Sequence, residues 1–250
     1  MSQFNPKIFS ERLGTPRPAQ RPPVLNRVDF GAFRPMQTAR KTSFFLPVHY
    51  EKNYAYPLIV WLHTPGEDES QLMRVLPMIS LRNYAAVAIR GAQLMFPNGA
   101  LRPGFHWAAE TYEEVLDTVL EAIDQARSRL NIASKRIYLV GSEDGGTMAQ
   151  RLAFLHPHPF CGVASLDGAP PEDILLLERW RDLREVRFLY AVSRASKTCP
   201  ADELCSHLGI MHSAGLDVTL RSYPTAGSLQ IDMLRDVDRW IMGNIDSVLK

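Results

Sequence analysis

The chain has 250 residues, 46% of them hydrophobic, with 28 Lys and Arg against 27 Asp and Glu. These figures fit a globular chain that can bury a substantial core, and they exclude a disordered one. Three cysteines in 250 residues exclude a disulfide scaffold, and no apolar run reaches the roughly 20 residues that span a bilayer. With an odd number of cysteines and no secretory pattern at its start, the chain is expected in a reduced cytoplasmic setting.

A basic, proline-rich N-terminal arm is expected over residues 1–41. It holds eight basic and two acidic residues, a net charge of +6, whereas the remaining 209 residues carry −5. Six of the 18 prolines fall in this arm, and proline lacks the backbone N–H that helices need, so the arm is expected to be extended or partly disordered. Because its charge density is modest, the arm is expected to be a solvated tail that lies on the acidic body, and nucleic-acid binding is not expected. A protein partner that meets the arm is the remaining alternative.

Short apolar runs alternate with helical repeats over residues 42–250, and no linker or internal repeat interrupts them. Apolar runs bounded by turn residues predict buried strands, and apolar residues at steps of three and four predict helices. In chain order the pattern predicts strands at 44–48 and 58–62, a helix capped by Ser70 that carries Leu72 to Ile79, a strand at 85–89, a helix over 112–130, strands at 137–140, 162–166, 188–192 and 218–223, and a helix over 231–248. Because strands without polar alternation are covered on both faces, these elements predict one domain over 42–250. It is an α/β fold, a three-layer sandwich with a mainly parallel sheet of roughly eight strands.

The most informative segment is Gly141-Ser142-Glu143-Asp144-Gly145, which joins the strand at 137–140 directly to an amphipathic helical pattern. Glycines on both sides allow a tight turn that exposes the central side chain. The segment resembles the nucleophile elbow, G-x-S-x-G, of the α/β-hydrolase fold. His63, at the end of a buried strand, and Gly227-Ser228, before the last helix, resemble the oxyanion turn and the histidine segment of that fold. Over about residues 40 to 250 the chain is similar to the phospholipase/carboxylesterase and polyhydroxybutyrate-depolymerase-like branch of the α/β hydrolases.

The resemblance indicates which positions would carry catalysis, and all three hold another residue. Glu143 stands where the family has its nucleophilic Ser. Ser196, four residues before Pro200, stands where the family has Asp, and Ser228 stands where it has His. A serine hydroxyl is far too weak a base to replace an imidazole, and it supplies no anion to orient one.

Five further positions are candidates for the site. Thr64 and Asp144 are the oxyanion-equivalent positions, whereas His63, Ser142 and Trp107 are candidate binding residues. No H-x-x-x-H or C-x-x-C spacing occurs, so neither a metal site nor a cofactor is expected.

Two functions remain open at this point. The first is a pseudoenzyme, in which an esterase-type scaffold binds a small molecule or a partner without hydrolysing esters. It is favoured because three catalytic roles are lost at three separate loops. The alternative is an active serine hydrolase of small carboxylic esters, with a rearranged site built from Ser142 and a histidine of a neighbouring loop. The expected partners are a small-molecule ligand or ester and a protein that meets the arm, but no membrane span and no nucleic acid.

Overall fold

The computed structural model describes residues 41–96, 104–174, 179–194, 196, 198–224 and 229–248. The arm expected over 1–41 therefore lies outside the described residues except for its last position, and so does Ser228. The strands and the main helices predicted over 42–250 fall within the described ranges.

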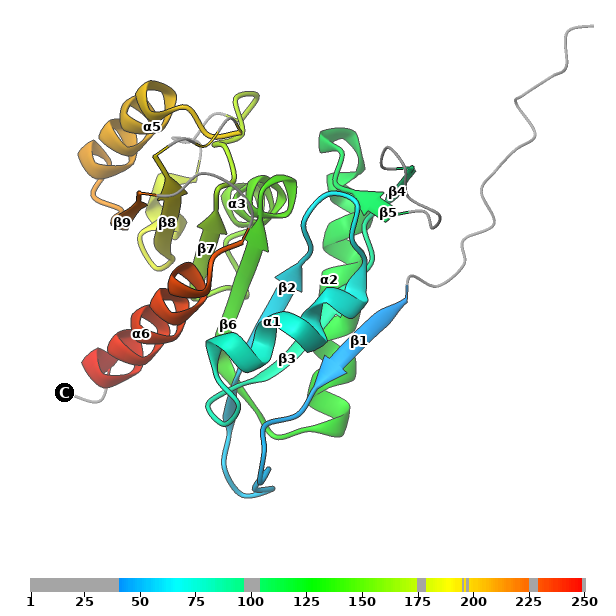
Figure 1. The fold of residues 1–250 in the computed structure, drawn as a ribbon. Coiled ribbons are helices and arrows are strands. Elements are labelled where there is room, and N and C mark those ends of the chain that lie inside the picture. Colours follow the sequence, from blue (N-terminus) through cyan, green and yellow to red (C-terminus); the bar gives the residue numbers. More distant parts are fainter. Residues whose placement is uncertain are drawn as a thin grey trace, which may run out of the picture. The chain divides into compact units, whose positions relative to one another are not determined.

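A mainly parallel sheet of seven strands runs through the described residues, in the order β1-β3-β2-β6-β7-β8-β9 (Figure 1). β1 is antiparallel to β3, and all other neighbouring strands are parallel. Every residue of β2, β3 and β7 is buried, as expected for apolar runs that are covered on both faces. The strands are β1 (Thr42–Phe45), β2 (Tyr56–Leu62), β3 (Ala85–Ile89), β6 (Ile132–Ser142), β7 (Gly162–Leu166), β8 (Arg187–Ser193) and β9 (Asp217–Tyr223).

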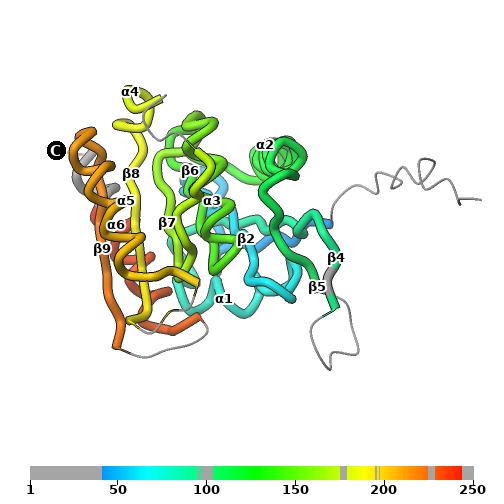
Figure 2. The backbone as a smooth tube through the Cα atoms, turned by 90° about the horizontal axis from the view of Figure 1, so that it is seen from above, coloured from blue at the N-terminus to red at the C-terminus, as the bar shows by residue number. Residues whose placement is uncertain are grey.

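Helices cover both faces of this sheet, so the predicted three-layer α/β sandwich is confirmed (Figures 1 and 2). One buried cluster joins one face of the sheet to α2 (Tyr112–Arg129), α3 (Asp144–Leu155), α4 (Trp180–Leu183) and α5 (Ala201–Ser213). A second cluster joins the opposite face to α1 (Leu72–Ile79) and α6 (Ile231–Val248). The two clusters follow the alternation of side chains along each strand.

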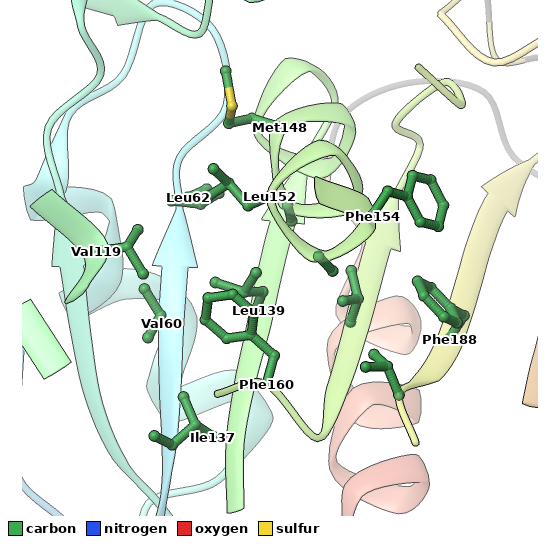
Figure 3. Close-up of a cluster of buried hydrophobic side chains, with 14 of the residues drawn as sticks. Val60, Leu62, Val119, Ile137, Leu139, Met148, Leu152, Phe154, Phe160 and Phe188 are labelled. Atoms are coloured by element: carbon green, nitrogen blue, oxygen red, sulfur yellow. The ribbon is translucent and has the colours of Figure 1, made fainter. Parts of the chain in front are cut away.

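The packing of α3 positions the predicted elbow. Figure 3 shows Met148 and Leu152 of this helix beside Leu62 of β2 and Leu139 of β6. Leu152, Leu62 and Leu139 are fully buried, and Met148 is 2% exposed. Burying side chains of this size contributes about 1.5–3 kcal/mol each, so the start of α3 is held firmly at the carboxyl ends of β2 and β6.

Four short elements were not expected, and one predicted helix cap is wrong. β4 (Gln93–Met95) and β5 (Gly104–His106) form a separate antiparallel pair, and the 3-10 turns η3 (Glu69–Gln71) and η4 (Ala109–Thr111) precede α1 and α2. The prediction that Ser70 caps the helix is wrong. Ser70 lies inside the 3-10 turn η3, which Asp68 caps by accepting the Ser70 N–H at 2.9 Å, and α1 follows Gln71, whose side chain caps no backbone N–H.

Candidate functional site

The strand-to-helix turn predicted from the glycine pattern is present, with Glu143 at its apex. β6 ends at position 142 and α3 begins at position 144, so Glu143 alone makes the turn. Its backbone has φ 52° and ψ −121°, a region that residues with a side chain rarely adopt. A Cβ at Gly141 would come within 2.2 Å of the Gly145 carbonyl oxygen, and one at Gly145 within 2.4 Å of the Leu62 carbonyl oxygen. Only glycine fits at both positions, which explains the spacing in the sequence.

Three carboxylates lie around this turn: Glu143, Asp144 and Asp167, which directly follows β7. Burial raises the pKa of Glu143, and the nearby charges of Asp144 and Asp167 raise it further. Burial also raises the pKa of Asp144, against a smaller lowering by the charge of His106. The site is therefore negatively charged and partly shielded from water, an environment that favours a proton, a cation or a hydrogen-bond donor.

Glu143→Gln is expected to make the protein more stable at neutral pH. The folded state raises the pKa of Glu143 and therefore binds its proton more tightly than the unfolded chain does. The resulting contribution to stability is present at low pH and is lost as the pH rises through the raised pKa. The stability advantage of the Gln variant should therefore shrink as the pH falls toward the ordinary carboxyl range. Urea unfolding between about pH 4 and pH 8 measures this.

Glu121→Gln, on the exposed side of α2, is the matched control for the loss of one carboxylate. An advantage of Glu143→Gln that grew as the pH fell would contradict the raised pKa of Glu143.

Asp167 is absent from the positions predicted above, although it is the most buried carboxylate of the site. It is 7% exposed and has φ 54°. Its carboxylate oxygens accept hydrogen bonds from the Ser193 backbone N–H at 2.7 Å and from the Ser193 hydroxyl at 2.8 Å. Gln230 Nε2–H donates to the same hydroxyl oxygen at 3.0 Å. The sequence pattern that points to Asp167 is a polar residue directly after a buried parallel strand, where such folds carry their sites.

Ser196, predicted at the acid position, is engaged within its own loop. Its Oγ lies 3.0 Å from Thr198 Oγ1 and accepts the Cys199 N–H at 3.2 Å. The Thr198 hydroxyl donates to the Asp167 carbonyl oxygen at 2.8 Å. The loop after β8 is thereby tied to the end of β7, next to the carboxylates. Ser228, the third predicted position, lies outside the described residues.

The oxyanion-equivalent turn after β2 is closed by a glutamine side chain. The Thr64 N–H donates to Gln71 Oε1 at 3.1 Å, and Gln71 Nε2–H donates to Thr64 Oγ1 at 2.9 Å. Trp61 Nε1–H donates to the same Gln71 oxygen at 2.9 Å, and Pro65 has no N–H. The Asp144 N–H lies in the first turn of α3, where backbone donors have no partner within the helix. Of the two predicted oxyanion donors, the Thr64 amide is thus already engaged inside the protein.

His63 is fully buried, and both of its ring nitrogens are bonded to backbone groups. Nδ1–H donates to the Thr64 carbonyl oxygen at 2.9 Å, and Nε2 accepts the Gly91 N–H at 2.9 Å. Burial lowers the pKa of His63, in agreement with this neutral tautomer. Trp107 packs against the ring at 4.7 Å between centroids and donates its Nε1–H to the His63 carbonyl oxygen at 2.8 Å. The ring therefore holds the turn after β2 against β3 and the segment after β5.

All seven histidines of the chain lie among the described residues. Besides His63, only His207 forms a hydrogen bond through its imidazole ring, and its Nε2 lies 3.1 Å from the Tyr190 hydroxyl. Burial lowers the pKa of His207 to about 4. No histidine hydrogen-bonds Glu143 or Ser142, and Ser142 is only 2% exposed in β6. No imidazole is thus in place to take a proton at the elbow in this structure.

A small pocket opens beside the elbow, along one face of α3. Its volume is about 120 Å³, and it is lined by Trp107, Ala109, Asp144, Thr147, Met148 and Arg151. Two predicted positions, Trp107 and Asp144, therefore share one pocket.

In the described ranges, no group of three or more His, Cys, Asp or Glu residues is arranged to hold a metal ion. No described helix is long and apolar enough to cross a membrane. The cysteines are free: Cys161, Cys199 and Cys205.

Comparison with known proteins identifies the fold. No family model matches the chain. The structure is similar to a carboxylesterase from Mesorhizobium loti, with a TM-score of 0.65 and 19% identity over 83% of this chain and 97% of that one. It is equally similar to the Bacillus cereus carboxylesterase, with a TM-score of 0.65 and 17% identity over 83% and 95% of the two chains. At these identities the likeness shows that the chain has the α/β-hydrolase fold, in the form seen in carboxylesterases.

One curated relative matches part of the chain. It is NocK of Nocardia uniformis subsp. tsuyamanensis, which is named as an esterase without an established activity. It is 26% identical over 121 residues, which are 47% of this chain and 35% of NocK. The matched stretch thus spans about a third of that relative's length, and any activity carried over from it is a proposal.

Proposed function

We propose that this chain is a pseudoenzyme, a protein of carboxylesterase-like α/β-hydrolase fold that binds a small molecule at the elbow without hydrolysing esters. The observation that carries the proposal is Glu143 at the apex of the elbow, with no histidine hydrogen-bonded to it. Serine hydrolases need a neutral hydroxyl nucleophile and an imidazole that removes its proton. A carboxylate in that place repels the electron-rich oxygen of an ester carbonyl that an oxyanion site would have to stabilise.

The oxyanion-equivalent turn supports the same proposal. Hydrolases of this kind rely on backbone N–H groups that are free to stabilise the developing oxyanion, and losing one such donor typically costs about a hundredfold or more in rate. Here the Thr64 N–H is bonded to Gln71 Oε1 at 3.1 Å. The fold is that of a hydrolase, but the Thr64 N–H is not free to stabilise an oxyanion. This combination fits ligand binding better than acyl transfer.

The alternative is an active ester hydrolase that uses Ser142. The similarity of the structure to carboxylesterases favours it. Against it, Ser142 is 2% exposed and receives no hydrogen bond from a histidine.

A paired assay tests the proposal. Purified full-length protein is expected to release no p-nitrophenol from p-nitrophenyl acetate or butyrate above background, and to remain unlabelled by a fluorophosphonate probe. An active carboxylesterase is measured in parallel to show that the substrates and the probe react. Turnover or labelling that disappears in Ser142→Ala would establish the alternative, and turnover that disappears in Glu143→Gln would also overturn the pseudoenzyme.

The arm over residues 1–41 and the setting of the protein belong to the same proposal. With a net charge of +6, the arm suits contact with a protein partner of opposite charge. A cytoplasmic, reducing setting fits three free cysteines.

A further inference from the structure

The pocket beside the elbow accepts only a small ligand. Its volume of about 120 Å³ corresponds to about four water molecules at roughly 30 Å³ each, well below the roughly 300–1,000 Å³ of sites for drug-sized ligands. The helix α3 contributes Asp144, Thr147, Met148 and Arg151 to its lining, and the segment after β5 contributes Trp107 and Ala109. The spacing of three, four and seven residues along α3 places these four side chains on one face of the helix.

The end of the pocket next to the elbow favours a positive charge. Burial raises the pKa of Asp144, and the carboxylate of its sequence neighbour Glu143, whose own pKa the charge of Asp144 raises, adds negative charge. The opposing influence on Asp144 is the smaller one of His106. A carboxylate that has lost part of its hydration is stabilised most strongly by a cation that also donates hydrogen bonds to it.

Trp107 adds a second surface that suits a cation. The indole is 6% exposed and held in place by its hydrogen bond to the His63 carbonyl oxygen and by contact with the His63 ring. Tryptophan is the aromatic side chain that attracts ammonium groups most strongly over its face. A fixed indole beside Asp144 is therefore a suitable surface for a small ammonium group.

The far end of the pocket offers hydrogen-bond donors without net charge. The Arg151 side chain is 8% exposed, and its Nη1 and Nη2 donate to the Asp173 carboxylate at 2.8 and 2.6 Å. Within the described residues this guanidinium forms no other hydrogen bond, so its remaining N–H donors have no protein partner. Because Asp173 already neutralises Arg151, a neutral acceptor such as a hydroxyl fits here better than a second carboxylate.

From this arrangement we infer that the pocket binds a small aliphatic ammonium compound that carries a neutral hydrogen-bond acceptor at its far end. The ammonium group lies on Asp144 and Trp107, and the acceptor meets the free N–H groups of Arg151. The Cα atoms of Asp144 and Arg151 are about 10 Å apart along the helix axis, so a short chain between the two groups is needed. The inference rests on the proposed binding function and names its ligand class.

Calorimetric titration of the full-length protein with three probes of similar size tests the ligand class. The probes are 4-amino-1-butanol, n-pentylamine, which lacks the acceptor, and pentanoate, which carries the opposite charge. We expect the amino alcohol to bind most tightly, n-pentylamine more weakly, and pentanoate not at all. Preferred binding of pentanoate, equal binding of all three, or binding of none would overturn the inference.

Two variants locate the binding. Asp144→Asn keeps the shape of the side chain and removes its charge. The affinity for 4-amino-1-butanol should therefore fall by at least about tenfold. Asp232→Asn is the matched control, because Asp232 is 74% exposed on α6, on the opposite face of the sheet. Equal affinity in both variants would place the amine elsewhere and overturn the inference. Ester turnover, measured separately, decides the pseudoenzyme proposal, so the two can fail independently.

Discussion

Gly145→Ala is expected to lower the free energy of unfolding by about 3 kcal/mol or more. An added Cβ would lie 2.4 Å from the Leu62 carbonyl oxygen and 2.6 Å from that of His63. Both are backbone atoms at the end of β2, so neither can rotate away, and α3 would have to move off the sheet. Urea or thermal unfolding of the purified variant measures the loss.

Gly209→Ala is the control for this substitution. Gly209 lies within α5, is exposed, and a Cβ there would meet no atom within 4 Å. Because glycine inside a helix is less favourable than alanine by roughly 0.5–1 kcal/mol, this variant should be slightly more stable than the parent. Similar stability of the two variants would show that α3 does not pack on the end of β2 as closely as the structure has it.

Asp167→Ala is the second substitution with a large expected effect, a loss of about 2–4 kcal/mol in the free energy of unfolding. It removes the acceptor of the buried Ser193 N–H and hydroxyl, which are bonded at 2.7 and 2.8 Å. It also leaves alanine at φ 54°, where a side chain without local hydrogen bonds is strained. Chemical unfolding of the variant measures the sum of the two effects.

Asp167→Asn separates geometry from charge. Asparagine tolerates a positive φ and its amide oxygen can still accept the Ser193 N–H, so the loss should stay below about 1 kcal/mol. Removing the negative charge should at the same time lower the pKa of Glu143, which NMR titration of its carboxyl carbon can follow. If Asp167→Asn were as unstable as Asp167→Ala, the carboxylate charge itself would be required, and the hydrogen-bond explanation would be wrong.

These substitutions test an elbow whose tight turn does not depend on the chemistry of the residue at its apex. Gly141 and Gly145 are needed for the tight turn whether or not the apex residue is a nucleophile. Glu143 keeps a strained backbone, which costs on the order of 1–3 kcal/mol and persists only when the surroundings enforce it. Under the proposed function, the carboxylate of Glu143, with its raised pKa, takes the part of a binding group at the elbow.

Much of the fold was predictable because buried parallel strands admit few residue types. The strand predicted at 58–62 is β2 (Tyr56–Leu62), and the one predicted at 85–89 is β3 with the same bounds. The exceptions are short. β4 and β5 pair with each other, and β5 bonds to the turn after β2, where the Gly66 N–H donates to the Phe105 carbonyl oxygen at 2.9 Å. Such strands are held by contacts distant in sequence, which leave no periodic pattern.

By itself, the sequence determined the α/β sandwich and the elbow with Glu143 at its apex. Both depend on local rules: apolar runs for strands covered on both faces, and glycines where a Cβ would clash. Only the tertiary structure decided what surrounds the elbow. Asp167 accepts a hydrogen bond from Ser193, 26 positions later in the sequence, and Gln71 accepts one from the Thr64 N–H. These contacts form because the order and register of the sheet bring the ends of separate strands together. Hydrogen bonds between loops of different strands depend on that register, and no local pattern of residues encodes them.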